Sequence, residues 1–429
     1  MITPPTGDWR AFIGVWLRIG LLSFGGPAGQ IALMHRELVE RRRWIDDAAY
    51  LRALNFVMLL PGPEAQQLSI WCGWRLRGVR GGLVAGLAFV LPGAAVMAAL
   101  TFLYIGYGRL PLVQAVFFGV QAVVLAVVAQ ALARVAARAL NGSLAWGLAV
   151  VAFALLFFFD VPFPAVVLGA GVTGALVSGR FSDAGRDDAP ENGARGSWRA
   201  SAATALLWAG IWAVPVVAAA LWLGGDHELV ALGRFFAGQA AVTFGGAYAA
   251  LSYVAQAAVE QRQWLTAPEM IDGLGLAETT PGPLVLVFQF VGGLAGARFD
   301  GLGSAGAALG MAMVVWVTFA PSFLWVFALA PHLDALMRRP ALAGALQAIT
   351  AAVVGVMANL ALWFALHVLF EDIAARHFGW LRLWQPGGTF EWGAAGIAVV
   401  ALTFLIWARV GLGWVLLLGA VAGIAMNGF

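Results

Sequence analysis

The chain has 429 residues, of which 62% are hydrophobic and only 11% are charged, and its formal net charge is +3. Soluble domains carry about 25% charged residues, and so small a positive charge gives no reason to expect a nucleic-acid partner. The composition excludes a soluble globular protein and predicts an all-α polytopic membrane protein in a lipid bilayer. The single cysteine, Cys72, excludes an internal disulfide and a cysteine-cluster metal site. We expect no metal and no cofactor.

Apolar stretches that predict membrane helices alternate with polar connectors along the chain. The first six lie at 9–33, 51–74, 79–107, 110–137, 143–159 and 161–179. The stretch 180–200 is rich in Gly, Asp and Arg, which predicts a linker on an aqueous face. One further apolar segment covers 201–223, and six more lie at 228–258, 268–297, 303–331, 340–370, 391–407 and 411–428. The N-terminal sequence MITPPTGDWR lacks the basic region of a signal peptide, so we expect it to be retained.

The two sets of six segments resemble each other. SFGG at 23–26 returns as TFGG at 243–246, ERRRW at 40–44 as EQRQW at 260–264, and LPGP at 60–63 as TPGP at 280–283, always 220 residues later. Residues 24–63 compared with 244–283 without a gap share eleven identities (Phe, Gly, Gly, Val, Glu, Arg, Trp, Leu, Pro, Gly, Pro). We predict two homologous six-segment repeats, at 1–179 and 228–429. A polar linker and one extra helix at 180–227 join them.

Each repeat carries a Pro-Gly-Pro sequence inside an apolar segment. Helix interiors avoid proline, and in lipid every backbone polar group must find a partner. Such a break therefore survives only where it lines a cavity or packs within protein. The helix that restarts after it directs free N–H groups and a positive dipole end inward, which makes an anion site. A simple proline kink is the alternative reading. Matched breaks in duplicated halves are typical of secondary transporters.

The first segment contains a second interruption, SFGGP at 23–27. Glycine lets a backbone or a ligand approach closely. Tight helix packing through small residues explains the same pattern, so both readings stay open. The copy in the second repeat keeps the hydroxyl and both glycines, but Ala247 replaces the proline.

These motifs resemble one known family. LRIGLLSFGGPAGQIALMHRELVERRRWID, LLPGPEAQQL and RGGLVAGLAFVLPG in the first half are similar to the chromate ion transporter family. TFGGAYAALSYVAQAAVEQRQWLT and AETTPGPLVLVFQFVGGLAG are similar to its C-terminal domain. The resemblance covers nearly the whole chain and implies the long two-domain form. It implies export of chromate across the bacterial inner membrane, chromate resistance, and competition by sulfate.

Chromate and sulfate are tetrahedral dianions, and backbone N–H groups, hydroxyls, amides and arginines bind such ions. The residues expected to bind substrate are Arg18, Ser23, Gly25, Gly26, Pro61, Gly62, Pro63, Gln66, Gln67, Arg234, Thr243, Gly245, Gly246, Thr280, Pro281, Gly282, Pro283 and Gln289. For Arg234, a position at a span end with the side chain reaching the interface is an alternative. Glu64 and Glu278 are proton-coupling candidates, and a salt bridge to arginine is the alternative for each. Ser23, Gly62, Thr243 and Gly282 are predicted to line one shared cavity.

The orientation of the two repeats is open from the residues alone. If the broken segments 51–74 and 268–297 are re-entrant, most arginines of the first half share one face, which the positive-inside rule makes cytoplasmic, and the halves are parallel. If both segments cross the membrane fully, the halves are inverted. The family resemblance implies oppositely oriented halves, and we predict inverted repeats. The functional alternatives are an oxyanion channel, an uptake system and an intramembrane enzyme. No HExxH, GxGD or Ser/His pairing supports the enzyme. A homo-oligomer is left open.

Overall fold

The computed structural model describes residues 8–24, 26–177, 197–244, 246–299, 301–337 and 339–428. The chain divides into two compact units. The first unit comprises 1–102, 183–250 and 277–339, and the second comprises 103–182, 251–276 and 340–429. Each unit therefore takes segments from both predicted repeats. Most of the predicted linker 180–200 lies outside the described residues.

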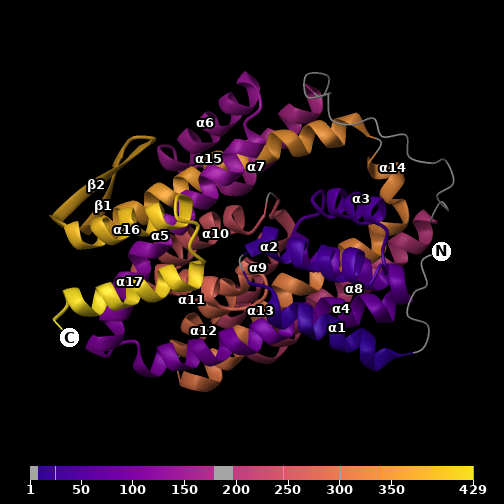
Figure 1. The fold of residues 1–429 in the computed structure, drawn as a ribbon, viewed down its shortest axis with the longest axis horizontal. Coiled ribbons are helices and arrows are strands. Elements are labelled where there is room, and N and C mark those ends of the chain that lie inside the picture. Colours follow the sequence, from indigo (N-terminus) through magenta and orange to yellow (C-terminus); the bar gives the residue numbers. More distant parts are fainter. Residues whose placement is uncertain are drawn as a thin grey trace. The chain divides into compact units, whose positions relative to one another are not determined.

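All the secondary-structure elements in the described part of the first unit are helices (Figure 1). Its elements are α1 (Trp9–Leu22), α2 (Gly26–His35), the π-helix η1 (Arg36–Arg41), α3 (Asp47–Val57), most of α4 (Glu64–Tyr107), α8 (Trp198–Leu223), α9 (Glu228–Val242), the start of α10 (Ala247–Gln256), the 3-10 helix η4 (Leu284–Leu286), α12 (Val287–Ala297), α13 (Gly303–Leu329), η5 (Ala330–His332) and α14 (Leu333–Met337). Helix α13 is the centre of this unit, because it packs against α8, α9 and α12.

The second unit combines helices with one β-hairpin. Its elements are α5 (Pro111–Ala139), α6 (Ser143–Phe157), α7 (Phe163–Leu176), the end of α10, the π-helix η3 (Ala257–Gln261), most of α11 (Ala267–Thr279), α15 (Pro340–Leu369), β1 (Phe370–Phe378), β2 (Leu381–Phe390), α16 (Trp392–Ile406) and α17 (Leu412–Met426). Helix α5 packs along α16 and α17, and α15 packs along α6 and α7 (Figure 1).

The helices are interrupted at the proline and glycine sequences. Helix α3 ends at Val57 and α4 begins at Glu64, while α11 ends at Thr279 and helical structure resumes at Leu284. The predicted segment 9–33 is divided into α1 and α2. Helix α4 is itself bent, because its backbone is non-helical at Arg77 and Gly78.

Five helices in the described ranges are long and apolar enough to cross a membrane. They are α4, α5, α8, the helix 303–332 and α15. The predicted spans at 143–159, 161–179, 391–407 and 411–428 instead form α6, α7, α16 and α17, of 14 or 15 residues each. At 1.5 Å per residue such a helix is about 22 Å long, shorter than a hydrocarbon core of about 30 Å. The length of the apolar stretches therefore overestimated the length of these four helices.

The expectation of an all-α chain needs one correction. β1 and β2 pair antiparallel, with Phe378 opposite Leu381. The two-residue turn between them contains Gly379, whose φ of 60° suits a tight hairpin turn. Only Arg382 of the hairpin is fully buried. The sequence left 371–390 as a connector, because it lacks the alternation that marks a half-buried strand.

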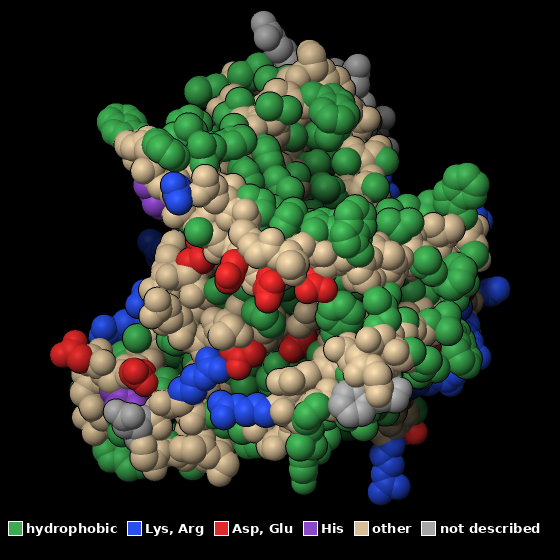
Figure 2. All heavy atoms as spheres, turned by 90° about the vertical axis from the view of Figure 1, so that its left-hand side faces the viewer, with side chains coloured by type: hydrophobic (Ala, Val, Ile, Leu, Met, Phe, Trp, Pro, Cys, Tyr) green, Lys and Arg blue, Asp and Glu red, His purple; other side chains and the backbone are tan. Residues whose placement is uncertain are grey.

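Hydrophobic side chains cover much of the molecular surface on the face shown in Figure 2. Helix α8 buries only Ser201 and Ala219, while Leu221 and Trp222 are 84% and 88% exposed. A large exposed apolar surface on a long apolar helix is what lipid contact requires. The chain is therefore a multi-pass membrane protein.

Candidate functional site

The two Pro-Gly-Pro breaks are each held by the opposite half of the sequence. The backbone N–H of Gly62 donates to the carbonyl oxygen of Thr243 at 2.9 Å, and that of Gly282 donates to the carbonyl oxygen of Ser23 at 2.8 Å. Gly62 has a φ of 116° and Gly282 a φ of 95°, a region that glycine enters freely and other residues avoid. The break of one half therefore meets the SFGG or TFGG interruption of the other. We call the two contacts the Gly62–Thr243 crossing and the Gly282–Ser23 crossing.

The hydroxyls at the two crossings bond within their own helices. Ser23 Oγ donates to the carbonyl oxygen of Ile19 at 2.6 Å. Thr243 Oγ1 lies 2.7 Å from both the carbonyl oxygen and the side-chain Oε1 of Gln239. Each hydroxyl has one proton, so in this conformation neither has a hydrogen left to donate to a substrate.

A small pocket lies at the Gly62–Thr243 crossing. It is lined by Gly62, Pro63, Gln239, Ala240, Thr243, Gly246, Ala247, Ala250, Val285, Phe288 and Thr318. Its volume of about 10 Å³ holds one water molecule, so a larger guest requires the pocket to widen. Gln239 and Thr318 are 3% and 5% exposed, and Gln239 Nε2 and Thr318 Oγ1 have no hydrogen-bond partner in the described structure. A buried polar atom without a partner is costly, which marks this pocket as a place for a polar guest.

Three more polar side chains surround the same crossing. Gln66 Nε2 donates to the carbonyl oxygen of Phe319 at 3.4 Å, and Gln67 Nε2 donates to that of Pro61 at 2.7 Å. Ser322 Oγ lies 3.6 Å from where a Cβ on Gly62 would stand. Within the described residues, Gln66 Oε1, Gln67 Oε1 and Ser322 Oγ are buried without a partner.

The Gly282–Ser23 crossing is closed by packing. Gln30 Nε2 donates to the carbonyl oxygen of Gly282 at 2.6 Å. A Cβ on Gly93 would lie 2.0 Å from the carbonyl oxygen of Pro281, and one on Gly282 would lie 3.1 Å from Leu286 Cδ1. Side chains and backbone thus fill the space that remains open at the other crossing.

The remaining residues predicted at or just after the second break are also buried. Thr280 and Pro283 belong to its buried stretch. Gln289 Nε2 donates to the carbonyl oxygen of Ala94 at 2.9 Å. These residues support the packed crossing and are not among those that line the pocket.

The two predicted arginines do not join either crossing. Arg18 is exposed on α1, whose buried residues are Phe12, Val15, Trp16, Ile19 and Gly20. Arg234 is exposed on α9, and its Nη1 donates to the carbonyl oxygen of Gly225 at 3.4 Å. Gly26 and Gly246 have φ values of 72° and 91°, whereas Gly25 and Gly245 lie outside the described residues.

Two of the carboxyl groups in the apolar segments have neutral partners. Glu278 is 8% exposed, and its Oε1 accepts from Tyr248 Oη at 2.8 Å. Asp272, which the sequence reading passed over, accepts from Tyr104 Oη at 2.7 Å and from Gln121 Nε2 at 2.8 Å. Sequence reasoning also missed Gln30, Gln239, Thr318 and Ser322. Each of these residues is a polar residue inside an apolar stretch, and this is the sequence feature that could have identified it.

Charged groups outside the predicted spans pair with one another. Glu37 accepts from Arg41 at 2.7 Å and also from Arg42. Burial alone would raise the pKa of Glu37, but the hydrogen bonds and charges of Arg41 and Arg42 outweigh it and hold the pKa below 4.5. In the part of the chain that the structure describes, no group of three or more His, Cys, Asp or Glu side chains is arranged to hold a metal ion.

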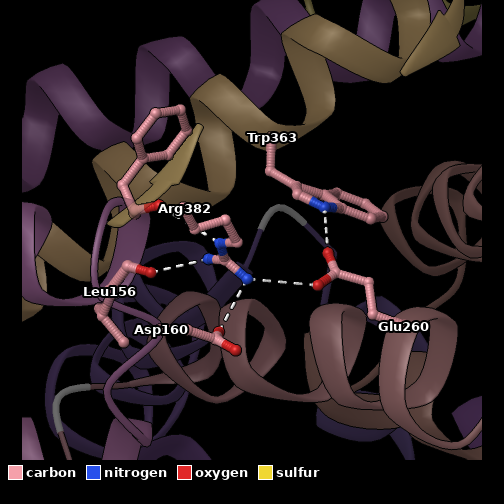
Figure 3. Close-up of polar contacts among 6 residues, drawn as sticks. Leu156, Asp160, Glu260, Trp363 and Arg382 are labelled. Carbon is pink, nitrogen blue, oxygen red and sulfur yellow. Dashed lines mark hydrogen bonds and ion pairs between the residues drawn. The ribbon is translucent and has the colours of Figure 1, made fainter. Parts of the chain in front are cut away.

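The second unit contains a buried arginine cluster (Figure 3). Arg382, on β2, is 2% exposed and lies 2.7 Å from Asp160 Oδ1 and 3.4 Å from Glu260 Oε2. Its Nη2 donates to the carbonyl oxygen of Leu156 at 2.8 Å, and Trp363 Nε1 donates to Glu260 Oε1 at 2.7 Å. Burial raises the pKa of Glu260 although Arg382 and Trp363 oppose the shift. Four of the five guanidinium N–H groups of Arg382 therefore donate to protein acceptors, and the cluster anchors the hairpin.

Comparison with known proteins identifies the family. The family model described as chromate transporter matches residues 10–175 and 230–424. A chromate transport protein of Pseudomonas aeruginosa is 33% identical over 368 residues, covering 82% of this chain and 80% of that protein. One from Cupriavidus metallidurans is 31% identical (82% of each chain), and a probable chromate transport protein of Synechococcus elongatus is 30% identical (83% and 84%). No solved structure matches. The chain belongs to the chromate transporter family, whose named relatives are transport proteins and not enzymes.

Proposed function

We propose that this member of the chromate transporter family is a secondary active transporter that exports chromate, or a related tetrahedral oxyanion such as sulfate, across the bacterial inner membrane. The observation that carries the proposal is the pocket at the Gly62–Thr243 crossing, with the unpartnered Gln239 Nε2 and Thr318 Oγ1 in its lining. Amide and hydroxyl hydrogens are donors, and an oxyanion supplies only acceptors. These two unpartnered donors are therefore matched by a ligand with several acceptor oxygen atoms, such as an oxyanion.

The start of α4 adds a fixed electropositive end to this pocket. Gly62 and Pro63 line the pocket, and α4 begins at the next residue, Glu64. The first N–H groups of a helix have no intrahelical partner, and the helix dipole makes this end partly positive. The described lining residues carry no full charge. Neutral donors hold a dianion less tightly than a bidentate arginine would, which suits a transporter that must release its cargo.

The duplication supplies a physical route for alternating access. We propose that the repeats 1–179 and 228–429 are inverted relative to each other and that 180–227 joins them. Repeat transporters bind near the interface of their repeats, where the halves rock around one site. A backbone hydrogen bond joins the repeats at each crossing, and Gln30 Nε2 adds a second bond at the Gly282–Ser23 crossing. A rotation that breaks the Gly62–Thr243 hydrogen bond would widen the pocket for the oxyanion.

Chromate flux in membrane vesicles of both orientations tests this function. We expect chromate to accumulate in inverted vesicles that contain the protein, and to do so faster when a pH gradient or membrane potential is imposed. Sulfate in excess is expected to slow it. Flux in the opposite direction would favour an uptake system. Flux that only follows the chromate gradient, with no response to an imposed gradient, would favour a channel.

A further inference from the structure

A carboxyl side chain lies beside the pocket at the Gly62–Thr243 crossing. Glu64 is the first residue of α4. A Cβ placed on Gly246, which lines the pocket, would lie 3.3 Å from Glu64 Oε1 and 3.8 Å from Oε2. The carboxyl group of Glu64 thus lies against the pocket wall at the positive end of α4. It occupies the kind of position that an oxyanion prefers.

Some acidic residues of the protein are paired with arginine, whereas Glu64 forms no such pair among the described residues. Glu37 pairs with Arg41 and Arg42, and Glu260 pairs with Arg382. Within the described ranges Glu64 forms no salt bridge, and its carboxyl group lies at the N-terminal end of α4. The charge on Glu64 therefore depends on the same helix end that we assign to the substrate.

The groups around Glu64 leave it as the titratable member of this pocket. The described lining residues contributed by α9, α10, α12 and α13 are neutral. On α10 and α11, Tyr248 Oη donates to Glu278 Oε1 at 2.8 Å. The charged residues of α9, Glu228 and Arg234, are exposed.

We propose that Glu64 is a built-in competitor of the oxyanion, so that the pocket accepts a dianion only when Glu64 has taken up a proton from solution. This inference rests on the proposed function. A carboxylate and a dianion at one helix end repel each other, and both compete for the same N–H groups. Protonation removes the negative charge and leaves a neutral carboxyl, whose O–H is itself able to donate to the oxyanion. One proton therefore enters the site with each oxyanion.

The affinity of the purified full-length protein for chromate tests the linkage. Equilibrium dialysis with chromate gives Kd for the wild-type protein and for Glu64→Gln at pH values spanning the titration of protein carboxyl groups. The ratio of the two Kd values cancels the titration of chromate itself. We expect a ratio near one at the acidic end that rises toward tenfold per pH unit once Glu64 is ionised. Glu228→Gln, which changes the exposed first residue of α9 in the same way, is the matched control and is expected to keep the wild-type pH dependence.

A second measurement needs no variant. Chromate added to wild-type protein in weak buffer is expected to cause uptake of up to one proton per bound ion, beyond the change seen with chromate alone. The inference would be overturned if Kd had the same pH dependence in the wild-type protein and Glu64→Gln, or if the wild-type protein took up no proton at any pH. Chromate binding in the same experiments would still support the proposed site. No chromate binding by any variant at any pH would overturn the proposed function, and the inference with it.

Discussion

Gly62 and Thr243, 181 positions apart in the sequence (243 − 62), share a backbone hydrogen bond of 2.9 Å. The bond joins the Pro-Gly-Pro break of one half to the TFGG interruption of the other. Its counterpart, between Gly282 and Ser23, measures 2.8 Å. The same pair of motifs therefore makes the same contact twice, and the side chains around the two contacts differ. That difference is the basis of the predictions about the pocket.

Replacing Gly62 by valine should abolish chromate flux while the protein still inserts into the membrane. A φ of 116° is unfavourable for a β-branched residue, so the break must change its course. Flux per amount of membrane-inserted protein measures this. Gly142→Val is the control, because Gly142 also has a positive φ, of 94°, with open space around it. Normal flux through well-inserted Gly62→Val protein would refute a functional role for the break.

Arg18→Gln should leave the Km for chromate within about twofold of the wild-type value, because a side chain that makes no contact with the site contributes little to binding. Arg18 is exposed on α1, on the side away from that helix's buried residues. The sequence expectation was the opposite, since a mid-segment arginine is usually functional. A Km raised tenfold or more, which corresponds to about 1.4 kcal/mol, would show that Arg18 does contribute to substrate binding.

Glu37→Gln should lower the melting temperature near neutral pH, and the loss should shrink as the pH falls. The pKa of Glu37 is depressed in the folded protein, so its stabilisation is fully present above 4.5 and disappears as the pH drops through the folded value. Arg41 is 53% exposed, so screening limits the effect to about 1–2 kcal/mol. Thermal unfolding in detergent at several pH values measures it. A difference that stays constant on acidification would contradict the role of the two arginine pairs.

Arg382→Ala should destabilise the protein by about 1.5–3 kcal/mol, because it removes the charged hydrogen bonds of a buried guanidinium, while the carboxyl groups of Asp160 and Glu260 remain 52% and 28% exposed to solvent. The arginine bonds Asp160, Glu260 and the carbonyl oxygen of Leu156 (Figure 3). Unfolding in detergent gives the change. Arg376→Ala is the matched control on the partner strand, since Arg376 is exposed. Equal effects of the two substitutions would show that the buried cluster does not stabilise the hairpin.

The breaks were readable from the sequence, and most of the pocket was not. Proline and glycine inside apolar stretches mark where α3 and α11 end, because those residues act on the local backbone. The partner of each break comes from the other half of the chain, and nothing local specifies it. Gln239 and Thr318 are single polar residues in apolar helices, and only the helical face on which they lie makes them lining residues. Arg18 lies on the exposed face of α1, and for that reason it is not part of the site.

The double variant Gln239→Leu with Thr318→Val tests whether the pocket at the Gly62–Thr243 crossing binds the oxyanion. Gln239→Leu removes the side-chain amide, including the Oε1 atom that lies 2.7 Å from Thr243 Oγ1, and Thr318→Val removes the hydroxyl. Both substitutions keep an apolar side chain in the pocket, and a neutral hydrogen bond to the oxyanion contributes about 0.5–1.5 kcal/mol. In reconstituted vesicles we expect the Km for chromate to rise roughly 5-fold to 150-fold for the pair. Gln130→Leu, which removes an amide bonded to the carbonyl oxygen of Leu405 in the second unit, should leave the Km unchanged. An unchanged Km in the well-folded double variant would contradict the assignment of this pocket as the oxyanion site.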